Sequence, residues 1–175
     1  MIDACSIINF AAINRMPLFE TAMRGRGRWT QAVEGEVRRS SRGRQYQALR
    51  ALLDDDYLGE AIELDSDEDR AAIQDIRAAL GGVAAEPLKH LGEAETIRAI
   101  ESRPDLGSAI FLTDDRDATY LARNRGIMVK DTVWLMADAC SMGDMRCPEP
   151  YDVLQEMWEA ERGIVLPSGH EAVCP

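Results

Sequence analysis

Two short apolar runs separated by one helix constrain the fold of this chain more than any other feature. Residues 108–112 read SAIFL, residues 114–125 have the pattern of a helix that ends at Gly126, and residues 127–129 are apolar again. A strand, a helix and a strand in direct succession favour parallel pairing of the two strands, because parallel neighbours need a crossover connection of this kind. The sequence therefore predicts an α/β fold with a mostly parallel central sheet.

Helix-like and strand-like segments alternate along the rest of the chain as well. Further short strands are expected at residues 1–6 and 61–64. Helices are expected at residues 7–13, 17–23, 30–37, 45–53, 66–80, 93–102, 131–139 and 150–162. No internal repeat or linker interrupts the pattern. We therefore predict one domain over residues 1–146 and a C-terminal helix and tail, residues 147–175, that packs on this domain or extends from it.

The composition is that of a globular protein. Hydrophobic residues make up 46% of the 175 residues, which is enough for a sizeable core. No apolar run approaches the roughly 18 residues that a transmembrane helix needs, so we expect no membrane association. The opening MIDACSIINF has no basic segment before its apolar run, so we expect no export signal and a cytoplasmic location. The four cysteines, Cys5, Cys140, Cys147 and Cys174, lack metal-binding spacing and are expected to be reduced.

Positive charge is concentrated in one segment of an acidic chain. The formal net charge of −11 argues against a general affinity for nucleic acids. Residues 24–50 nevertheless contain eight arginines and only two acids, Glu34 and Glu36. The sequence leaves open whether this arginine-rich segment binds an anion or forms a solvated helical face.

Acidic residues follow the predicted strands or lie in the first turns of predicted helices. The acids concerned are Asp3, Glu36, Glu93, Glu95, Asp114 and Asp115, of which Glu36 lies inside a helix. Because the carboxyl ends of parallel strands meet at one edge of a sheet, we expect several of these side chains to converge. Converging carboxylates repel one another, and a hard divalent cation such as Mg²⁺ or Mn²⁺ relieves that repulsion. Such a site can activate water for cleavage of a phosphodiester bond.

Each acid also has a plainer interpretation. Asp114 and Asp115 can cap a helix, and the acids after Gly92 can be ordinary first-turn residues that favour the positive end of the helix dipole. Glu36 can be a surface residue of a charged helix. Asp3 is the hardest to explain in this way, because an aspartate between a strand-like start and an apolar helix rarely serves packing.

Four blocks of the sequence, taken in order, resemble those of PIN-domain nucleases. IDACSIINF is similar to the opening strand, Asp and apolar helix of that family, and VEGEV resembles the second block, with Glu36 as its acid. LGEAETIRAI resembles the third block, and FLTDDRDATYLARNRGIMV resembles the fourth, a strand that ends in Thr-x-Asp and leads into a helix. The resemblance covers about residues 1–135. Cys5 departs from the pattern, because the family often has Asn or Ser there.

The resemblance implies a three-layer α/β/α PIN-like domain that cleaves single-stranded RNA at a Mg²⁺ or Mn²⁺ site. Carried over by position, the catalytic metal ligands are Asp3, Glu36, Glu93 or Glu95, and Asp115, with Asp114 and Asp117 as neighbours able to assist. Many small bacterial members of the family are VapC-type toxins held by an antitoxin. The resemblance therefore also implies a toxin role, with an antitoxin protein as partner.

Two other classes of function remain open from the sequence. A non-catalytic PIN-like module would keep the acids but bind RNA or protein without cleaving it. A receiver-like signalling domain needs an acid pair near the first strand and a late lysine, whereas this chain has one early acid and only Lys89 and Lys130. The sequence also leaves the oligomeric state open, with a homodimer among the alternatives.

The arginine-rich segment gives the ribonuclease hypothesis a candidate RNA-binding surface. Arg26, Arg28 and Arg42 adjoin glycines or serines and are expected in exposed loops near the helix that carries Glu36. Trp29 is expected to stack on an unpaired base. Binding of an acidic antitoxin segment, or a plain solvated face, are the alternatives for the same arginines.

Overall fold

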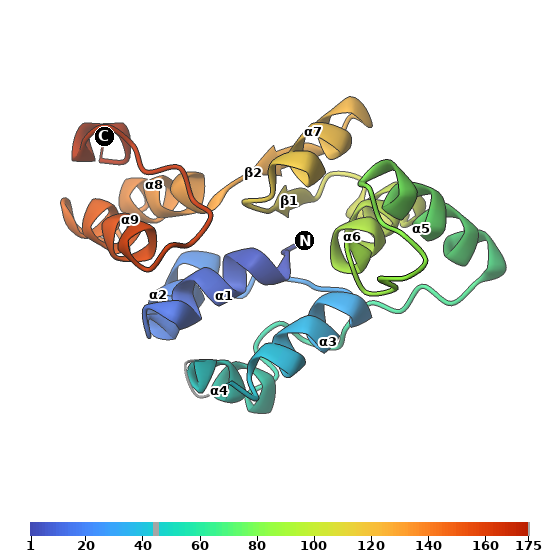
Figure 1. The fold of residues 1–175 in the computed structure, drawn as a ribbon. Coiled ribbons are helices and arrows are strands. Elements are labelled where there is room, and N and C mark those ends of the chain that lie inside the picture. The colour runs from blue at the N-terminus through green and yellow to red at the C-terminus, as the bar shows by residue number, and fades with distance from the viewer. Residues whose placement is uncertain (44–45, 175) are drawn as a thin grey trace.

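The computed structural model describes residues 1–43 and 46–174, and it is mostly helical (Figure 1). Its α-helices are α1 (Ala4–Ala12), α2 (Met16–Met23), α3 (Gln31–Ser40), α4 (Ala48–Asp54), α5 (Asp67–Ala79), α6 (Leu91–Ser102), α7 (Arg116–Asn124), α8 (Thr132–Ser141) and α9 (Glu149–Glu159). Two short 3-10 helices are η2 (Pro104–Leu106) and η3 (His170–Ala172). Arg44 of the arginine-rich segment and Gln45, the expected start of a helix, lie outside the described residues. No helix in the described part is long and apolar enough to cross a membrane.

The regular sheet consists of two parallel strands, β1 (Ile110–Leu112) and β2 (Met128–Lys130). Helix α7 connects them, so the strand–helix–strand unit expected from the sequence is confirmed. Phe111 lies opposite Val129 in the register of the pair, and both side chains are buried. Because the strands are parallel, both carboxyl ends lie at the same edge of the sheet.

Three further segments continue the sheet through single bridges. Ile2 pairs with Leu112, and Thr30 pairs with Ile62, both in the parallel direction. The backbone N–H of Ile2 also donates to the carbonyl of Arg28 at 2.9 Å, which joins the two bridged pairs. Across the molecule the order is therefore residue 62, residues 28–30, residues 1–3, β1 and β2.

The expected mostly parallel central sheet is thus reduced to two strands and these bridges. The strand predicted for residues 1–6 stops at Asp3, because the Asp3 side chain accepts the N–H of Ala4 at 2.7 Å and begins α1. The strand predicted for residues 61–64 is a single bridge at Ile62. The prediction of an α/β fold is confirmed in a coarser form, since helices predominate around a small parallel sheet.

Two buried apolar clusters support the strands. In Figure 1, α5 and α6 lie to one side of the strands, and α8 and α9 lie to the other. One cluster joins α1, α2, α8 and α9 and contains Phe10, Phe19 and Leu135. The other lies among α5, α6, α7 and the strands and contains Ile97 and Phe111. The strands therefore contribute to both clusters, through Ile2 and Leu112 on one side and Phe111 and Val129 on the other.

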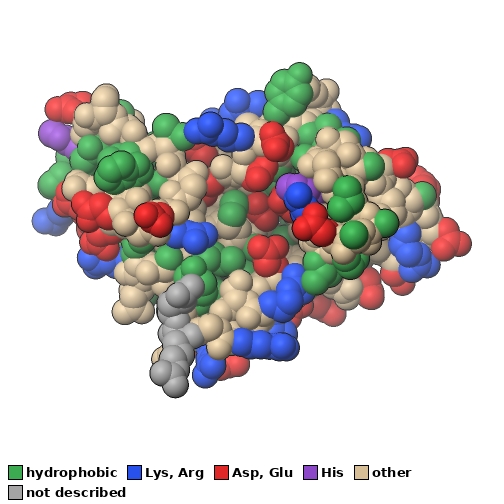
Figure 2. Space-filling model, in the orientation of Figure 1, with side chains coloured by type: hydrophobic (Ala, Val, Ile, Leu, Met, Phe, Trp, Pro, Cys, Tyr) green, Lys and Arg blue, Asp and Glu red, His purple; other side chains and the backbone are tan. Residues whose placement is uncertain are grey.

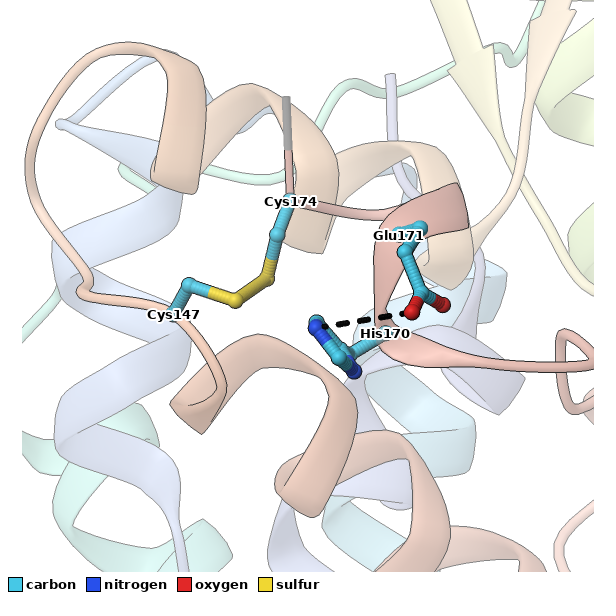
Figure 3. Close-up of a disulfide and its surroundings, with 4 residues drawn as sticks. All are labelled: Cys147, His170, Glu171 and Cys174. Carbon is cyan, nitrogen blue, oxygen red and sulfur yellow. Dashed lines mark ion pairs between the residues drawn. A yellow bond between two sulfur atoms is a disulfide. The ribbon is translucent and has the colours of Figure 1, made fainter.

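The C-terminal helix and the segment after it fold back onto the rest of the chain. Helix α9 contacts α1 and α8. Cys147 and Cys174 form a disulfide, with their Cα atoms 5.7 Å apart, and Figure 3 shows it beside the ion pair of His170 and Glu171. The expectation that all four cysteines are reduced is wrong for this pair. The sequence could not show it, because the tail returns across 27 positions to reach Cys147.

Loss of the disulfide is expected to lower the free energy of unfolding. Closing a loop across a separation of 27 residues corresponds to about 3.5 kcal/mol of chain entropy. The double variant Cys147→Ser and Cys174→Ser should therefore unfold at lower urea concentration than the wild type. Cys140→Ser, which changes a free cysteine, is the control. Equal urea midpoints for the double variant and the wild type, without reductant, would contradict this stabilisation.

Candidate functional site

Asp3 lies at the carboxyl edge of the sheet and is almost completely buried, with 3% of its surface exposed. One carboxylate oxygen, Oδ1, accepts the N–H of Ala4 at 2.7 Å. The other oxygen, Oδ2, accepts the hydroxyl of Thr113 at 2.9 Å and the thiol of Cys5 at 3.0 Å. The start of α1 and the end of β1 therefore fix the direction of this carboxylate.

Gly92, in the first turn of α6, lies where Asp3 and Glu36 approach each other. A Cβ atom on Gly92 would lie 3.8 Å from Oδ1 of Asp3 and 3.9 Å from Oε2 of Glu36. It would also lie 3.2 Å from a methyl group of Val33. The absence of a side chain at Gly92 thus keeps open the space between two carboxylates that come from distant parts of the sequence.

Glu93 brings a third carboxylate to this place. Burial, and after it the negative charge of Glu93, raise the pKa of Asp3 to about 7. Burial and the charge of Glu93 also raise the pKa of Glu36, while Arg39 opposes this change. Nδ1 of His90 lies 3.2 Å from Oε1 of Glu93. The charge of Glu93 therefore acts on both Asp3 and Glu36, and we call these three residues the carboxylate site.

The carboxylate site has the chemistry that a hard divalent cation requires. Carboxylate oxygens are ligands that Mg²⁺ and Mn²⁺ favour, and the open space beside Gly92 adjoins two of them. On the face shown in Figure 2, acidic side chains gather in the middle of the molecule. Within residues 1–43 and 46–174, no group of three or more ligand-type side chains has the spacing of a formed metal site. The residues thus fit a metal by their chemistry, whereas the ligand geometry is not preformed.

Asp114 is held in a different way from the carboxylate site. Its carboxylate accepts the N–H and the hydroxyl of Thr132 at 2.9 and 2.6 Å, the hydroxyl of Ser6 at 3.0 Å and the side-chain amide of Asn9 at 2.9 Å. Burial raises the pKa of Asp114, and the bonds from Thr132 and Ser6 oppose that change. With four donors on its two oxygens, Asp114 ties α1 to the start of α8 and has little capacity left to assist a metal.

Asp115 lies next to the carboxylate site without joining it. Its Oδ1 accepts the N–H of Ala118 at 2.7 Å and caps α7. Its own backbone N–H donates to the hydroxyl of Thr113 at 3.2 Å, and the same hydroxyl donates to Asp3. Asp117 is exposed in the first turn of α7. The structure therefore links Asp115 to Asp3 through Thr113 and places Asp117 on the outer surface.

Glu95 stabilises the start of helix α3. Its Oε2 accepts the backbone N–H of Ala32 at 2.9 Å, in the first turn of α3. A carboxylate at this end of a helix satisfies a free N–H group and favours the helix dipole. Of the two glutamates in the first turns of α6, Glu93 is thus the one beside Asp3, and Glu95 steadies the helix that carries Glu36.

Trp29 does not lie on the surface, contrary to what was expected from the sequence. It is 3% exposed, and its indole N–H donates to the carbonyl of Gly59 at 2.9 Å. The expectation that Trp29 stacks on an unpaired base is therefore wrong. The reason is that residues 28–30 form an inner segment of the sheet, where a large aromatic side chain joins the core.

The arginines of the expected RNA-binding surface are also dispersed. Arg26 pairs with Asp138 at 3.2 Å. Arg28 is exposed, and its charge acts on the Met1 ammonium, which donates to Ile110 at the amino end of β1. Arg26 and Arg28 therefore lie toward the amino edge of the sheet, opposite to Asp3. Arg42 is exposed just beyond the end of α3.

Several residues at this edge were not anticipated from the sequence. They are Ser6, Asn9, Gly92, Thr113 and Thr132. Ser6 and Asn9 could have been recognised from the sequence, because they are polar residues three positions apart in an otherwise apolar helix. The structure shows both of them buried. The sequence does not indicate a role for Thr132, since a threonine after Asp131 is typical of a helix start.

Replacement of Asp114 by asparagine is expected to destabilise the fold. Asparagine has the same shape but directs an N–H₂ group at donors that need an acceptor, so we expect a loss of about 2 kcal/mol in the free energy of unfolding. Asp115→Asn is the matched control, because its side-chain oxygen keeps the cap of α7. Urea denaturation of both variants measures the difference. An Asp114→Asn protein as stable as Asp115→Asn would contradict the structural role of Asp114.

Comparison with known proteins gives one match. No curated protein and no solved structure shows a significant match to the chain. The family model described as "DUF3368: PIN domain" matches residues 1–166. The match includes the segments that carry Asp3, Glu36, Glu93 and Asp115, and it extends past α8 and α9, beyond the blocks that the sequence analysis recognised. The chain belongs to this PIN domain family.

Proposed function

We propose that this protein is a Mg²⁺- or Mn²⁺-dependent endoribonuclease that cleaves single-stranded RNA. The observation that carries the proposal is the approach of Asp3, Glu36 and Glu93 to one another around Gly92. Burial and the charge of Glu93 raise the pKa of Asp3 and of Glu36, and a bound cation would stabilise the ionised forms of both. Membership of the PIN domain family supports the proposal, since PIN domains are typically nucleases and commonly bind these metals.

The side chains at this edge have separable tasks in the proposed reaction. Asp3, Glu36 and Glu93 would hold the metal, with Asp115 beside them. A bound Mg²⁺ or Mn²⁺ supplies the activation of water and the neutralisation of charge on the phosphate. The hydroxyl of Thr113 orients Oδ2 of Asp3 and the backbone of Asp115 together. The burial of Asp3 excludes water from the carboxylate and strengthens its interaction with a cation.

The finer assignment is that the protein is the toxin of a toxin–antitoxin pair, within a three-layer α/β/α domain. Its support is the resemblance of the four sequence blocks to PIN-domain nucleases, since many small bacterial members of that family are VapC-type toxins. Single-stranded RNA and an antitoxin protein are the partners that this assignment requires. A small open reading frame directly upstream of the gene, overlapping it or nearly so, is the observation that would favour it further.

A non-catalytic PIN-like module that binds RNA or protein is the second candidate. One observation favours it: in the part of the chain that the structure describes, the carboxylates are not already at metal-ligand spacing. Ligand geometry of this kind can also form when the metal binds, because Glu36 and Glu93 are longer side chains on two different helices. The two candidates differ in whether RNA is cleaved, so one assay separates them.

Replacement of Asp3 by asparagine is expected to abolish RNA cleavage. The variant removes one ligand charge and keeps the side-chain shape, so we expect a loss of at least about 100-fold in the cleavage rate of labelled single-stranded RNA with Mn²⁺. Because the new amide also meets donors that Asp3 accepts, thermal unfolding first establishes that the variant is folded at the assay temperature. Asp105→Asn, in η2, is the control, because it removes one exposed carboxylate outside the site. Chelation of the metal should stop cleavage by the wild type. A folded Asp3→Asn protein that cleaves at the wild-type rate would contradict the assignment.

The space beside Gly92 gives a test that does not depend on activity. Gly92→Ala places a methyl group 3.8 and 3.9 Å from oxygens of Asp3 and Glu36, in the space a cation would use. We expect the Mn²⁺ affinity, measured by titration calorimetry, to fall about tenfold. Gly35→Ala is the matched control, because its new Cβ would meet only Arg39 on the same helix. Equal Mn²⁺ affinities of Gly92→Ala and the wild type would show that the metal does not bind beside Gly92.

A further inference from the structure

An arginine from the C-terminal segment reaches the carboxyl edge of the sheet. Helix α9 ends at Glu159, and Glu161 adopts a left-handed backbone conformation (φ 55°) that reverses the chain. Nε of Arg162 then donates to Oδ1 of Asn9, on α1, at 2.9 Å. Asn9 is 1% exposed, and its amide nitrogen donates to Asp114. A buried asparagine, itself held by the half-buried carboxylate of Asp114, thus determines where the guanidinium of Arg162 lies.

Arg162 lines a cavity that adjoins the carboxylate site. The cavity has a volume of about 230 Å³ and is bounded by Cys5, Asn9, Asp114, Asp115, Arg162 and Gly163. The thiol of Cys5 donates to Oδ2 of Asp3, so the wall of the cavity is in direct contact with the carboxylate site. Asp114 is satisfied by its four donors. Arg162 is therefore the cationic side chain among the residues that line this cavity, which also include Asp115.

The charge of Arg162 is not neutralised by a carboxylate within the described residues. Its hydrogen bonds there go to the uncharged side chains of Asn9 and Tyr46, at 2.9 and 3.5 Å. None of the ion pairs found in residues 1–43 and 46–174 involves Arg162. A guanidinium has five N–H donors in a planar fork that matches phosphate oxygens. Arg162 thus keeps both charge and donors for an anionic ligand.

We propose that Arg162 binds a phosphate group of single-stranded RNA in this cavity and so positions the strand against the carboxylate site. The proposal rests on the proposed ribonuclease function. The net charge of −11 and the clustered carboxylates both repel RNA, so a cation is needed where the strand meets the site. In the arginine-rich segment, Arg26 is paired with Asp138 and Arg28 lies at the opposite edge. Arg39 acts on Glu36, whereas the arginine that lines the cavity itself is Arg162. Arg162 is fixed at the required place by Asn9.

The test compares RNA binding by Arg162→Gln with that of the wild type over a range of salt concentrations. The probe is a short, mixed-sequence, fluorescent single-stranded RNA in EDTA, so that no metal-dependent cleavage takes place. We expect the Kd to rise about tenfold and the slope of log affinity against log salt to fall by about 0.7. Arg125→Gln is the matched control, because it removes an exposed arginine that pairs with Glu101 near the amino edge. Arg162→Lys, which keeps the charge and loses the fork, should recover part of the affinity.

A purely structural role of Arg162 predicts a different result. If Arg162 only braces the C-terminal segment on α1, Arg162→Gln will lower the thermal midpoint and leave the Kd and the salt slope at wild-type values, which overturns the proposal. A second measurement needs no variant: phenylglyoxal modification of Arg162 in the wild type should slow when the RNA is added. Equal modification rates with and without RNA also overturn the proposal.

Cleavage assays on the same proteins separate this proposal from the ribonuclease function. A wild type that cleaves RNA with Mn²⁺, together with an Arg162→Gln protein of unchanged KM and RNA affinity, overturns the phosphate-binding role alone. A wild type that binds RNA through Arg162 but does not cleave it overturns the ribonuclease function and leaves the phosphate-binding role. A wild type that neither binds nor cleaves single-stranded RNA overturns both.

Discussion

The burial of Asp3 is the constraint on which the arrangement of this edge depends. Its carboxylate begins α1 and accepts the hydroxyl of Thr113 at the end of β1, so one side chain fixes a helix against the sheet. Because its pKa is raised to about 7, the folded protein keeps a proton that the unfolded chain releases near pH 4. The free energy of unfolding of the metal-free protein therefore falls as the pH rises through this range. A bound cation offsets that loss, which couples stability to metal binding.

Carboxyl groups of the same type have different roles here because their neighbours differ. Asp114 is satisfied by four hydrogen bonds and Glu95 by the end of α3, so each stabilises the fold. Glu36 and Glu93 lie beside Asp3 and share with it burial and repulsion. An acid that has donors and no acid beside it is a structural group. Acids that face one another are candidates for a cation, even where donors also hold one of them, as at Asp3. This difference depends on tertiary contacts, and the acids look alike in the sequence.

The sequence predicted the features that depend on local pattern. The unit of β1, α7 and β2 was recognisable from two apolar runs and Gly126, and Asp3 was recognisable from its place between a strand-like start and an apolar helix. The failures concern contacts between distant segments. The exposure of Trp29 could not be judged, because it depends on residues 28–30 lying inside the sheet, and the bond between Cys147 and Cys174 depends on the return of the tail. The choice between Glu93 and Glu95 required the position of α3.

Helix α1 connects the carboxylate site, Asp114 and Arg162. The spacing of three residues at its start explains how. Asp3, Ser6 and Asn9 follow one another at intervals of three residues, so they lie on one side of the helix and face the carboxyl ends of the strands. Asp3 belongs to the carboxylate site, Ser6 and Asn9 hold Asp114, and Asn9 also receives Arg162 from the C-terminal segment. The remaining buried residues of α1 are mostly apolar and pack in the core that includes α9. The same packing that places Asp3 thus places Arg162, and the C-terminal segment is part of the site.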